Sequence, residues 1–237
     1  MTGREEDRAI LQRVETDLDR HVATIAQEFR EGFEAVDAIG RPAVTVYGSA
    51  RIGPGHPDYE RAREIGRRLA DAGFAVVTGG GPGIMEAANR GCQEAGGLSI
   101  GFNIELPHEQ GVNAYCDRSL TFRHFYARKT MLVKAAEGFI LCEGGFGTLD
   151  ELFESLTLIQ TGKVLHFPVV LFDSAFWSPL LAWVRDPLLA QGMVSPEDLD
   201  LLTVTDEPAE AVERIVSRHD ERALAESPHS PEKADAQ

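Results

Sequence analysis

Short apolar runs alternate with segments of helical spacing from residue 43 to residue 217, and this alternation constrains the fold more than any other feature. Seven apolar, β-rich runs cover residues 43–47, 74–78, 98–102, 119–122, 138–142, 168–172 and 202–205. The helical segments between and after them cover residues 58–72, 83–95, 123–137, 148–161, 176–190 and 207–217. This order is typical of a parallel sheet buried between helical layers. The sequence therefore predicts an α/β fold: a doubly wound, Rossmann-like parallel sheet with helices on both faces.

The two ends of the chain differ from this alternating centre. Residues 4–38 are polar with apolar residues at helical intervals, so we expect one or two helices packed on the main body. Residues 220–237 are polar, contain two prolines and lack an apolar period, which is typical of disorder. The expected organisation is an N-terminal helical extension over 1–40, a Rossmann-like nucleotide-binding catalytic domain over 41–219 and a disordered tail over 220–237.

Composition excludes several classes of function. The net charge is −15, of which the two ends contribute −10, and no run of Lys or Arg offers a face for nucleic acid. No stretch approaches the roughly 20 apolar residues of a membrane span, and the charged start lacks the apolar core of a signal peptide, so we expect a cytoplasmic protein. Three cysteines without CxxC spacing and seven scattered histidines predict no metal site.

The most informative motif is the run from Cys142 to Glu151, CEGGFGTLDE, where an apolar strand passes through glycines into a helix. Glycines expose backbone N–H groups, and the start of a helix carries about half a positive charge, so this geometry attracts an anion. Glu151 follows one turn later. An alternative is structural, because Thr148 and Glu151 have the spacing of a capping box, which needs no substrate.

Two earlier strand ends carry glycine turns as well. Gly48 and Ser49 follow the first strand, and the run Gly79 to Gly83, which includes Gly81, follows the second. On a parallel sheet all three turns would place N–H donors at one edge. The second turn can also be compared with a dinucleotide fingerprint that uses Glu105 for a ribose, but its glycine spacing is wrong, and a helix start after a tight turn explains most of it.

Two cations lie on the helix expected over 123–137. Arg128 and Lys129 flank an apolar stripe, so at least one of them borders the buried face. The pair is either a solvated basic edge or a group that reaches over the sheet edge toward a phosphate or a carboxylate.

Arg128 and Lys129, together with GGGPGIME over 79–86 and GGFGTLDE over 144–151, resemble the Lonely Guy (LOG) family of cytokinin riboside 5′-monophosphate phosphoribohydrolases. Many members of this family were once labelled lysine decarboxylases. The resemblance covers residues 43–217, and the N-terminal extension is similar to that of the longer bacterial branch. It implies hydrolysis of the N-glycosidic bond of an adenosine 5′-monophosphate, often N6-substituted, to free base and ribose 5-phosphate, with no cofactor and at least a homodimer.

The resemblance also implies roles for individual residues. Arg128 and Glu151 match the catalytic arginine and glutamate, and a carboxylate below C1′ can stabilise the oxocarbenium ion left by the departing base. The nucleotide-binding residues expected from the family motif and from the three strand ends are Gly48, Ser49, Gly81, Glu109, Lys129, Gly144, Gly145, Phe146, Gly147, Thr148, Asp150 and Thr157.

One residue departs from the family pattern, and two other functions stay open. Glu143 stands where the motif usually has proline, and its carboxylate either weakens phosphate binding or points to solvent. A related branch of the fold carries molybdenum cofactor, so a binding module without turnover is one alternative. A broader purine or pyrimidine monophosphate nucleosidase is the other. The sequence offers no recognisable setting for a pyridoxal-phosphate lysine, which argues against a decarboxylase.

Overall fold

The computed structural model describes residues 17–106, 111–164 and 167–226 of the 237. Its strands are β1 (Ala43–Tyr47), β2 (Ala75–Thr78), β3 (Ser99–Ile104), β4 (Arg118–Phe122), β5 (Phe139–Leu141), β6 (Val169–Phe172) and β7 (Leu202–Thr205). Its helices are α2 (Leu18–Asp37), α3 (Pro57–Asp71), α4 (Ile84–Glu94), α5 (Phe125–Lys134), α6 (Phe146–Gln160), α7 (Ser174–Trp183), the π-helical turn η1 (Val184–Leu189), α8 (Pro196–Leu199) and α9 (Pro208–Glu226).

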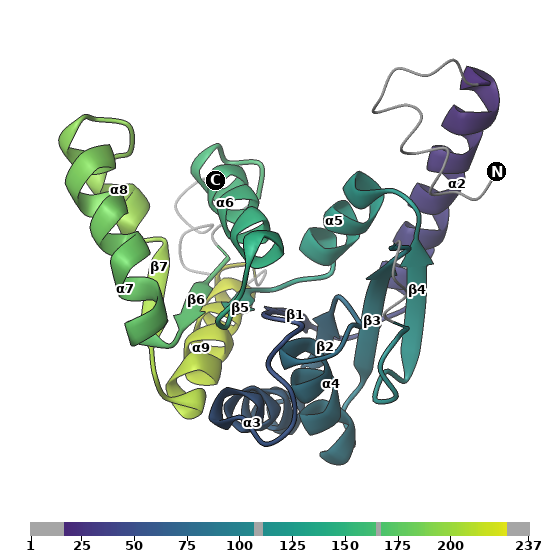
Figure 1. Cartoon of the computed structure of the whole chain (residues 1–237), viewed down its shortest axis with the longest axis horizontal. Coiled ribbons are helices and arrows are strands. Elements are labelled where there is room, and N and C mark those ends of the chain that lie inside the picture. The colour runs from purple at the N-terminus through teal and green to yellow at the C-terminus, as the bar shows by residue number, and fades with distance from the viewer. Residues whose placement is uncertain (1–16, 107–110, 165–166, 227–237) are drawn as a thin grey trace, which may run out of the picture.

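The strands form one seven-stranded parallel sheet in the order β4-β3-β2-β1-β5-β6-β7 (Figure 1). β1 lies at the centre, with Ala43 paired to Ala75 of β2 on one side and Thr45 paired to Phe139 of β5 on the other. The chain therefore builds outward from β1 to β4 and then returns to the other side of β1. This reversal between β1 and β5 is the switch point at which open parallel sheets bind ligands.

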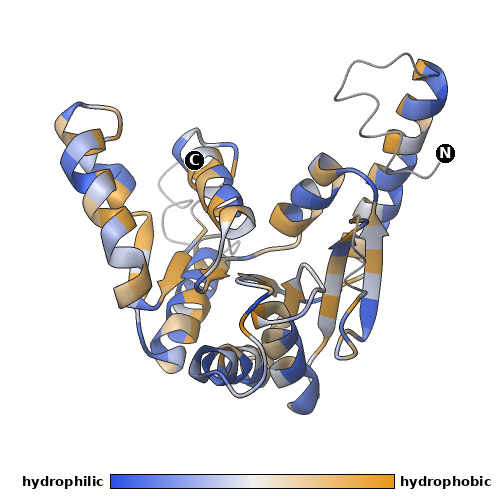
Figure 2. Cartoon of the chain, viewed as in Figure 1, coloured by the Kyte–Doolittle hydropathy of each residue, from blue (hydrophilic) through white to orange (hydrophobic). Residues whose placement is uncertain are grey.

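Helices cover both faces of the sheet, as the sequence predicts. Val44 and Val46 of β1 pack in the core with α3, α4 and α9, whereas Tyr47 packs in the core with α5, α6 and α7. Strands buried on both faces are apolar throughout, and β6 accordingly shows as hydrophobic in Figure 2. None of the helices in the described ranges is both long and apolar enough to cross a membrane.

Several element boundaries differ from those expected. The helix expected over 176–190 is split into α7 and η1, because Pro187 has no N–H to donate to the carbonyl of Trp183 four residues earlier. Pro179 lies inside α7, which continues past it. The last helix, expected to end at 217, continues to Glu226, so the predicted start of disorder at residue 220 is wrong. Arg222 pairs with Glu137 and lies over the ring of Phe167, and these contacts extend the helix. Residues 1–16 and 227–237 lie outside the described residues.

The N-terminal helix α2 supplies the cap of α5. The carboxylate of Glu28, which is 8% exposed, accepts hydrogen bonds from the backbone N–H groups of Arg123 (3.0 Å) and His124 (3.2 Å). The N-cap residue of α5, His124, makes no side-chain cap of its own, and its Nδ1 lies 3.0 Å from Glu28. Unsatisfied N–H groups at a helix start are costly when buried, so α2 completes a helix whose N-cap residue lies 96 residues after Glu28.

We expect Glu28→Ala to lower the free energy of unfolding by about 1–3 kcal/mol, because it leaves buried N–H groups at the start of α5 without an acceptor. Urea-induced unfolding measures this change. The matched control is Glu34→Ala on the exposed part of the same helix, which should stay within about 0.5 kcal/mol of the parent protein. Equal effects of the two substitutions would contradict the capping role.

Candidate active site

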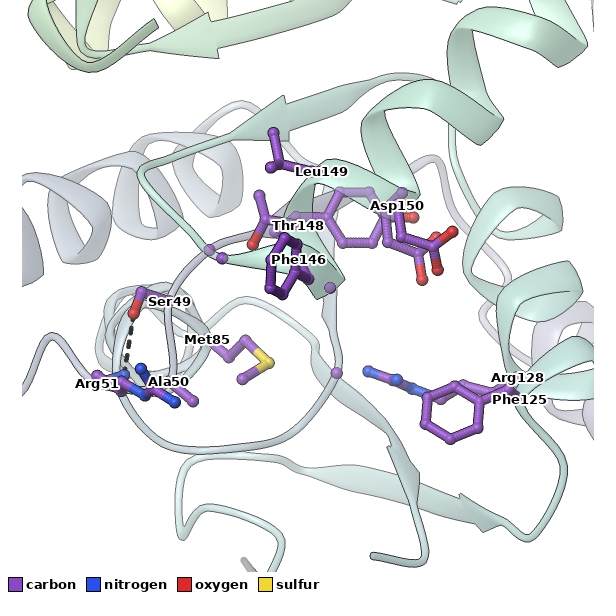
Figure 3. A pocket seen from close by; sticks show the side chains of 16 residues that line it. Ser49, Ala50, Arg51, Met85, Phe125, Arg128, Phe146, Thr148, Leu149 and Asp150 are labelled. Carbon is purple, nitrogen blue, oxygen red and sulfur yellow. Dashed lines mark hydrogen bonds between the residues drawn. The ribbon is translucent and has the colours of Figure 1, made fainter. Parts of the chain in front are cut away.

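A cleft of about 630 Å³ lies at the carboxyl ends of β1 and β5, at the switch point of the sheet (Figure 3). It brings together nine of the predicted site residues: Gly48, Ser49, Arg128, Gly145, Phe146, Gly147, Thr148, Asp150 and Glu151. It is also lined by residues that were not predicted: Tyr47, Ala50, Arg51, Gly79, Met85, Phe125 and Leu149. The prediction that the three glycine turns share one edge of the sheet is confirmed.

The three turns touch each other directly. The N–H of Ser49 donates to the carbonyl of Glu143 (2.8 Å), and the N–H of Ile84 donates to the carbonyl of Ser49 (2.9 Å). A Cβ atom at Gly48 would lie 2.3 Å from the side chain of Ile84, and one at Gly83 would lie 2.3 Å from the carbonyl oxygen of Ser49. Gly83 also has a φ of 74°. Glycine is therefore required at both contacts.

The start of α6 presents bare backbone donors to the cleft. The helix begins at Phe146 with Gly145 as its N-cap, and no side chain caps it. Thr148 therefore lies inside the first turn, and the alternative of a capping box between Thr148 and Glu151 is wrong. The positions around Gly145 and Gly147 are open, since a Cβ atom at either would meet nothing within 4 Å. Free N–H groups, open space and a helix dipole together suit an anion.

Glu151 is the buried acid of the cleft. Its side chain is 6% exposed, and its Oε2 has no hydrogen-bond partner among the described residues. Burial raises the pKa of this carboxyl to about 7, while the charges of Lys129 and Arg128 oppose the rise. A carboxyl that titrates near neutral pH in a cleft is typical of a catalytic group.

Arg128 lines the same cleft as Glu151, and backbone contacts hold its guanidinium in place. Its Nε donates to the carbonyl of Phe102 (2.8 Å), and its Nη2 approaches Gly79 so closely that a Cβ atom there would be only 2.3 Å away. Burial lowers the pKa of Arg128, and the charge of Glu151 raises it. Gly79 therefore makes room for the guanidinium of Arg128 in the cleft.

Lys129 binds protein carboxylates rather than lining the cleft. Its Nζ lies 2.9 Å from Asp150 and 3.0 Å from Glu154, so it links α5 to α6. Burial lowers the pKa of Lys129, but the hydrogen bonds to Asp150 and Glu154 outweigh it and raise the pKa.

Arg51 is the exposed cation of the cleft instead. The sequence predicts a binding loop after β1 because it follows a strand of the parallel sheet, but nothing in the sequence pattern selects the side chain of Arg51.

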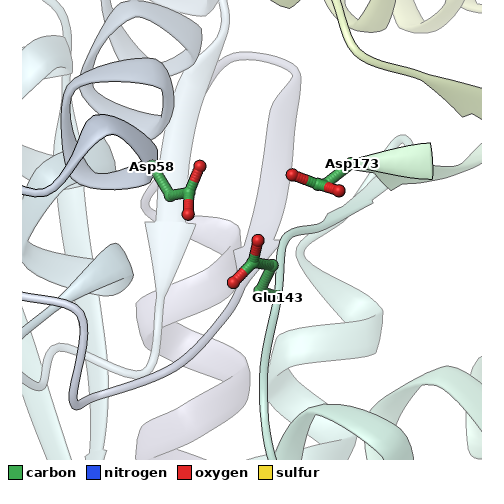
Figure 4. A group of neighbouring side chains, drawn as sticks. All are labelled: Asp58, Glu143 and Asp173. Atoms are coloured by element: carbon green, nitrogen blue, oxygen red, sulfur yellow. The ribbon is translucent and has the colours of Figure 1, made fainter. Parts of the chain in front are cut away.

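Glu143 turns away from the anion-binding loop. Its carboxylate meets those of Asp58 and Asp173, with ligand-type oxygens of all three within 4.8 Å, and it does not line the cleft (Figure 4). Burial, followed by the charges of Asp58 and Asp173, raises the pKa of Glu143. Arg61 binds Asp173 (2.6 Å) and Asp58, so a guanidinium supplies positive charge to this cluster. The acid that replaces the motif proline therefore does not oppose an anion in the cleft.

Four predicted residues lie elsewhere. Gly81 does not line the cleft, and its carbonyl accepts from the Asn113 amide (3.0 Å). Gly144 lies under Thr148, whose Oγ1 would be 2.0 Å from a Cβ atom at this glycine. Thr157 donates to the carbonyl of Phe153 (2.7 Å) and borders a separate apolar pocket between α6 and α7. Glu109 lies outside the described residues.

Comparison with known proteins gives consistent matches. Residues 85–215 match a family model described as possible lysine decarboxylase. A cytokinin riboside 5′-monophosphate phosphoribohydrolase of Mycobacterium tuberculosis is 32% identical over 75% of this chain and 95% of its own length. A probable enzyme of the same name from Oryza sativa is 30% identical over 69% and 68% of the two chains. The solved molybdenum cofactor binding protein of Rippkaea orientalis has a TM-score of 0.56 and 27% identity, covering 75% and 96%.

The titration of Glu151 predicts a pH-dependent cost to stability. Because its pKa is about 7 in the folded protein and 4.5 for an ordinary exposed glutamate, the folded state binds more protons, and stability falls as the pH rises from about 4.5 through 7. Glu151→Gln should therefore raise the free energy of unfolding at pH 8 by up to about 3 kcal/mol and change it little at pH 4.5. Denaturant unfolding of Glu151→Gln and Glu154→Gln at both pH values tests this, since only the first should gain stability at pH 8.

Proposed function

The chain belongs to the LOG family, and from this premise we propose that it hydrolyses the N-glycosidic bond of adenosine 5′-monophosphates, including those with an apolar substituent on N6. The products are the free base and ribose 5-phosphate. One observation carries the proposal: the buried carboxyl of Glu151, with one oxygen unpartnered, stands in the same cleft as the uncapped start of α6. The cleft therefore places a carboxyl group that can act at the reacting carbon close to a site that can bind the phosphate.

The 5′-phosphate binds at the start of α6. Gly145 and Gly147 let a phosphate approach the backbone, and the helix dipole favours its negative charge. Arg51 faces the same cleft from the loop after β1, where its N–H donates to the hydroxyl of Ser49 (3.1 Å). In Figure 3, Ser49 and Arg51 lie on one side of the cleft and Arg128 lies on the other. A guanidinium can bind two phosphate oxygens at once.

Glu151 acts at the anomeric carbon. When the bond between C1′ and the base nitrogen breaks, the ribose becomes positively charged, and the Glu151 carboxylate stabilises that charge and takes a proton from the attacking water. The water supplies the hydroxyl at C1′, the departing base takes a proton from solvent, and Glu151 returns the proton of the water to solvent, so the protons balance. Arg128 favours the ionised form of Glu151 by its charge. No step requires a metal or an organic cofactor.

The base binds against apolar side chains of the cleft. Phe146 is 92% exposed and Phe125 is 48% exposed, and both line the cleft together with Met85 (Figure 3). Aromatic rings left open to solvent are more useful as a binding surface than as core. Stacking on these side chains suits a purine and an apolar N6 substituent, and this supports the cytokinin-type substrate over a small pyrimidine.

The decisive experiment measures release of base and ribose 5-phosphate from AMP and from isopentenyladenosine monophosphate. We expect release from both nucleotides, none from adenosine, and a loss of at least about a hundredfold in kcat for Glu151→Gln. Glu154→Gln is the matched control on the same helix and should retain turnover. Equal rates for purine and pyrimidine monophosphates would favour the broader nucleosidase.

A folded protein that binds AMP without releasing base would support a nucleotide- or cofactor-binding module, such as the molybdenum cofactor binding protein with a similar fold. The homo-oligomeric state and the cytoplasmic location stay predictions, and so does the division between an N-terminal extension and a catalytic domain.

Arg51→Ala should raise the KM for AMP by about tenfold or more with a smaller change in kcat, because it removes a charged contact to the phosphate. Inorganic phosphate should also inhibit the variant less strongly than the parent protein. Arg41→Ala is the control, since Arg41 is exposed just before the opposite end of β1. An unchanged KM for AMP in Arg51→Ala would assign the phosphate to other donors.

A further inference from the structure

Two buried polar atoms in the cleft lack partners within the described residues: the hydroxyl of Tyr47 and Oε2 of Glu151. Each residue is 6% exposed, and both line the cleft. Leaving a buried donor or acceptor unsatisfied costs about 1–3 kcal/mol, and such groups in native proteins often mark a functional site. Two of them in one cleft indicate a ligand that satisfies both.

Packing alone does not explain a tyrosine at position 47. Its ring lies 6.0 Å from that of Phe139 and belongs to the core between the sheet and α6. A phenylalanine would fill the same space without burying a hydroxyl that finds no partner. The hydroxyl itself therefore requires an explanation.

The two atoms are chemically complementary. Burial and, after it, the charge of Glu151 raise the pKa of Tyr47 well above its usual value, so the hydroxyl stays protonated and is available as a donor. The ionised carboxylate of Glu151 only accepts. A hydroxyl group of a ligand can accept from Tyr47 and donate to Glu151 at the same time.

The stereochemistry of a nucleotide selects which alcohol. The base of a β-nucleotide leaves from one face of the ribose, so a carboxylate that acts at C1′ approaches the opposite face. The 2′-hydroxyl lies on that opposite face, on the carbon next to C1′. A residue beside Glu151 in the cleft can therefore reach this hydroxyl.

We infer that Tyr47 is a specificity-determining residue, whose hydroxyl donates to the 2′-oxygen of the substrate while the 2′-hydroxyl donates to Glu151. This inference rests on the proposed function. Its consequence is discrimination between ribonucleotides and 2′-deoxyribonucleotides, because a site built to bond a hydroxyl rejects the analogue that lacks it.

The test compares kcat/KM for AMP and 2′-deoxyAMP in the full-length protein and in Tyr47→Phe. The ratio of the two values in the parent protein, divided by the ratio in the variant, removes the intrinsic difference in reactivity between the substrates. We expect the preference for AMP to fall by about tenfold to a hundredfold in Tyr47→Phe. Tyr59→Phe is the control, because it removes a buried hydroxyl that bonds Glu86 (2.8 Å) outside the cleft, and it should keep the parent preference.

Three results would overturn the inference. An unchanged preference in Tyr47→Phe, with base still released from AMP, would refute the role of Tyr47 and leave the proposed function standing. A loss of preference against 3′-deoxyAMP instead of 2′-deoxyAMP would assign Tyr47 to the other hydroxyl. If the parent protein releases no base, the proposed function fails, and calorimetric binding of AMP and 2′-deoxyAMP decides whether Tyr47 discriminates. Equal affinities for the two nucleotides, or no binding, would then overturn the inference as well.

Discussion

Three loops can meet at the centre of the sheet because glycines stand where their backbones approach most closely. A Cβ atom at Gly48 would clash with Ile84, one at Gly83 would clash with the carbonyl of Ser49, and one at Gly144 would clash with Thr148. A side chain at Gly48 or Gly83 would force the loops after β1 and β2 apart, and one at Gly144 would displace Thr148 in the first turn of α6. The cleft, its bare N–H groups and the neighbourhood of Glu151 all follow from this close packing at the switch point.

The charged groups of the cleft differ in burial, and this difference separates the proposed catalytic group from the proposed phosphate-binding groups. Glu151 is buried and Arg128 is half-buried, and the charge of each alters the pKa of the other. Arg51 and the start of α6 lie where solvent or a ligand reaches them. A buried carboxyl with a raised pKa lowers the stability of the fold when it ionises, and a purely structural residue gains nothing in return. Such groups are common at catalytic sites.

The sheet, its parallel order and the cleft position were predictable from sequence because alternation and strand-end glycines are local patterns. The choice among side chains was less predictable. Arg128 and Lys129 are adjacent in the sequence. The orientation of α5 in the fold decides that Arg128 lines the cleft and that Lys129 pairs with Asp150 of α6. Likewise, helical spacing could not separate Glu151 from Glu154. Tyr47 was missed because an apolar strand hides a hydroxyl whose surroundings depend on packing between distant elements.

The cap that Glu28 provides to α5 has a consequence for the order in which a ribosome delivers the chain. Glu28 is synthesised 96 residues before His124, which at roughly 5–20 residues per second is on the order of 5–20 s. β1 also lacks one neighbouring strand during this interval, because it pairs with β5, where Thr45 lies opposite Phe139. During that interval the nascent chain holds α2 without its partner and β1 with one open edge, and an open strand edge invites wrong pairing. The central strand is therefore the part of the emerging protein with most need of protection.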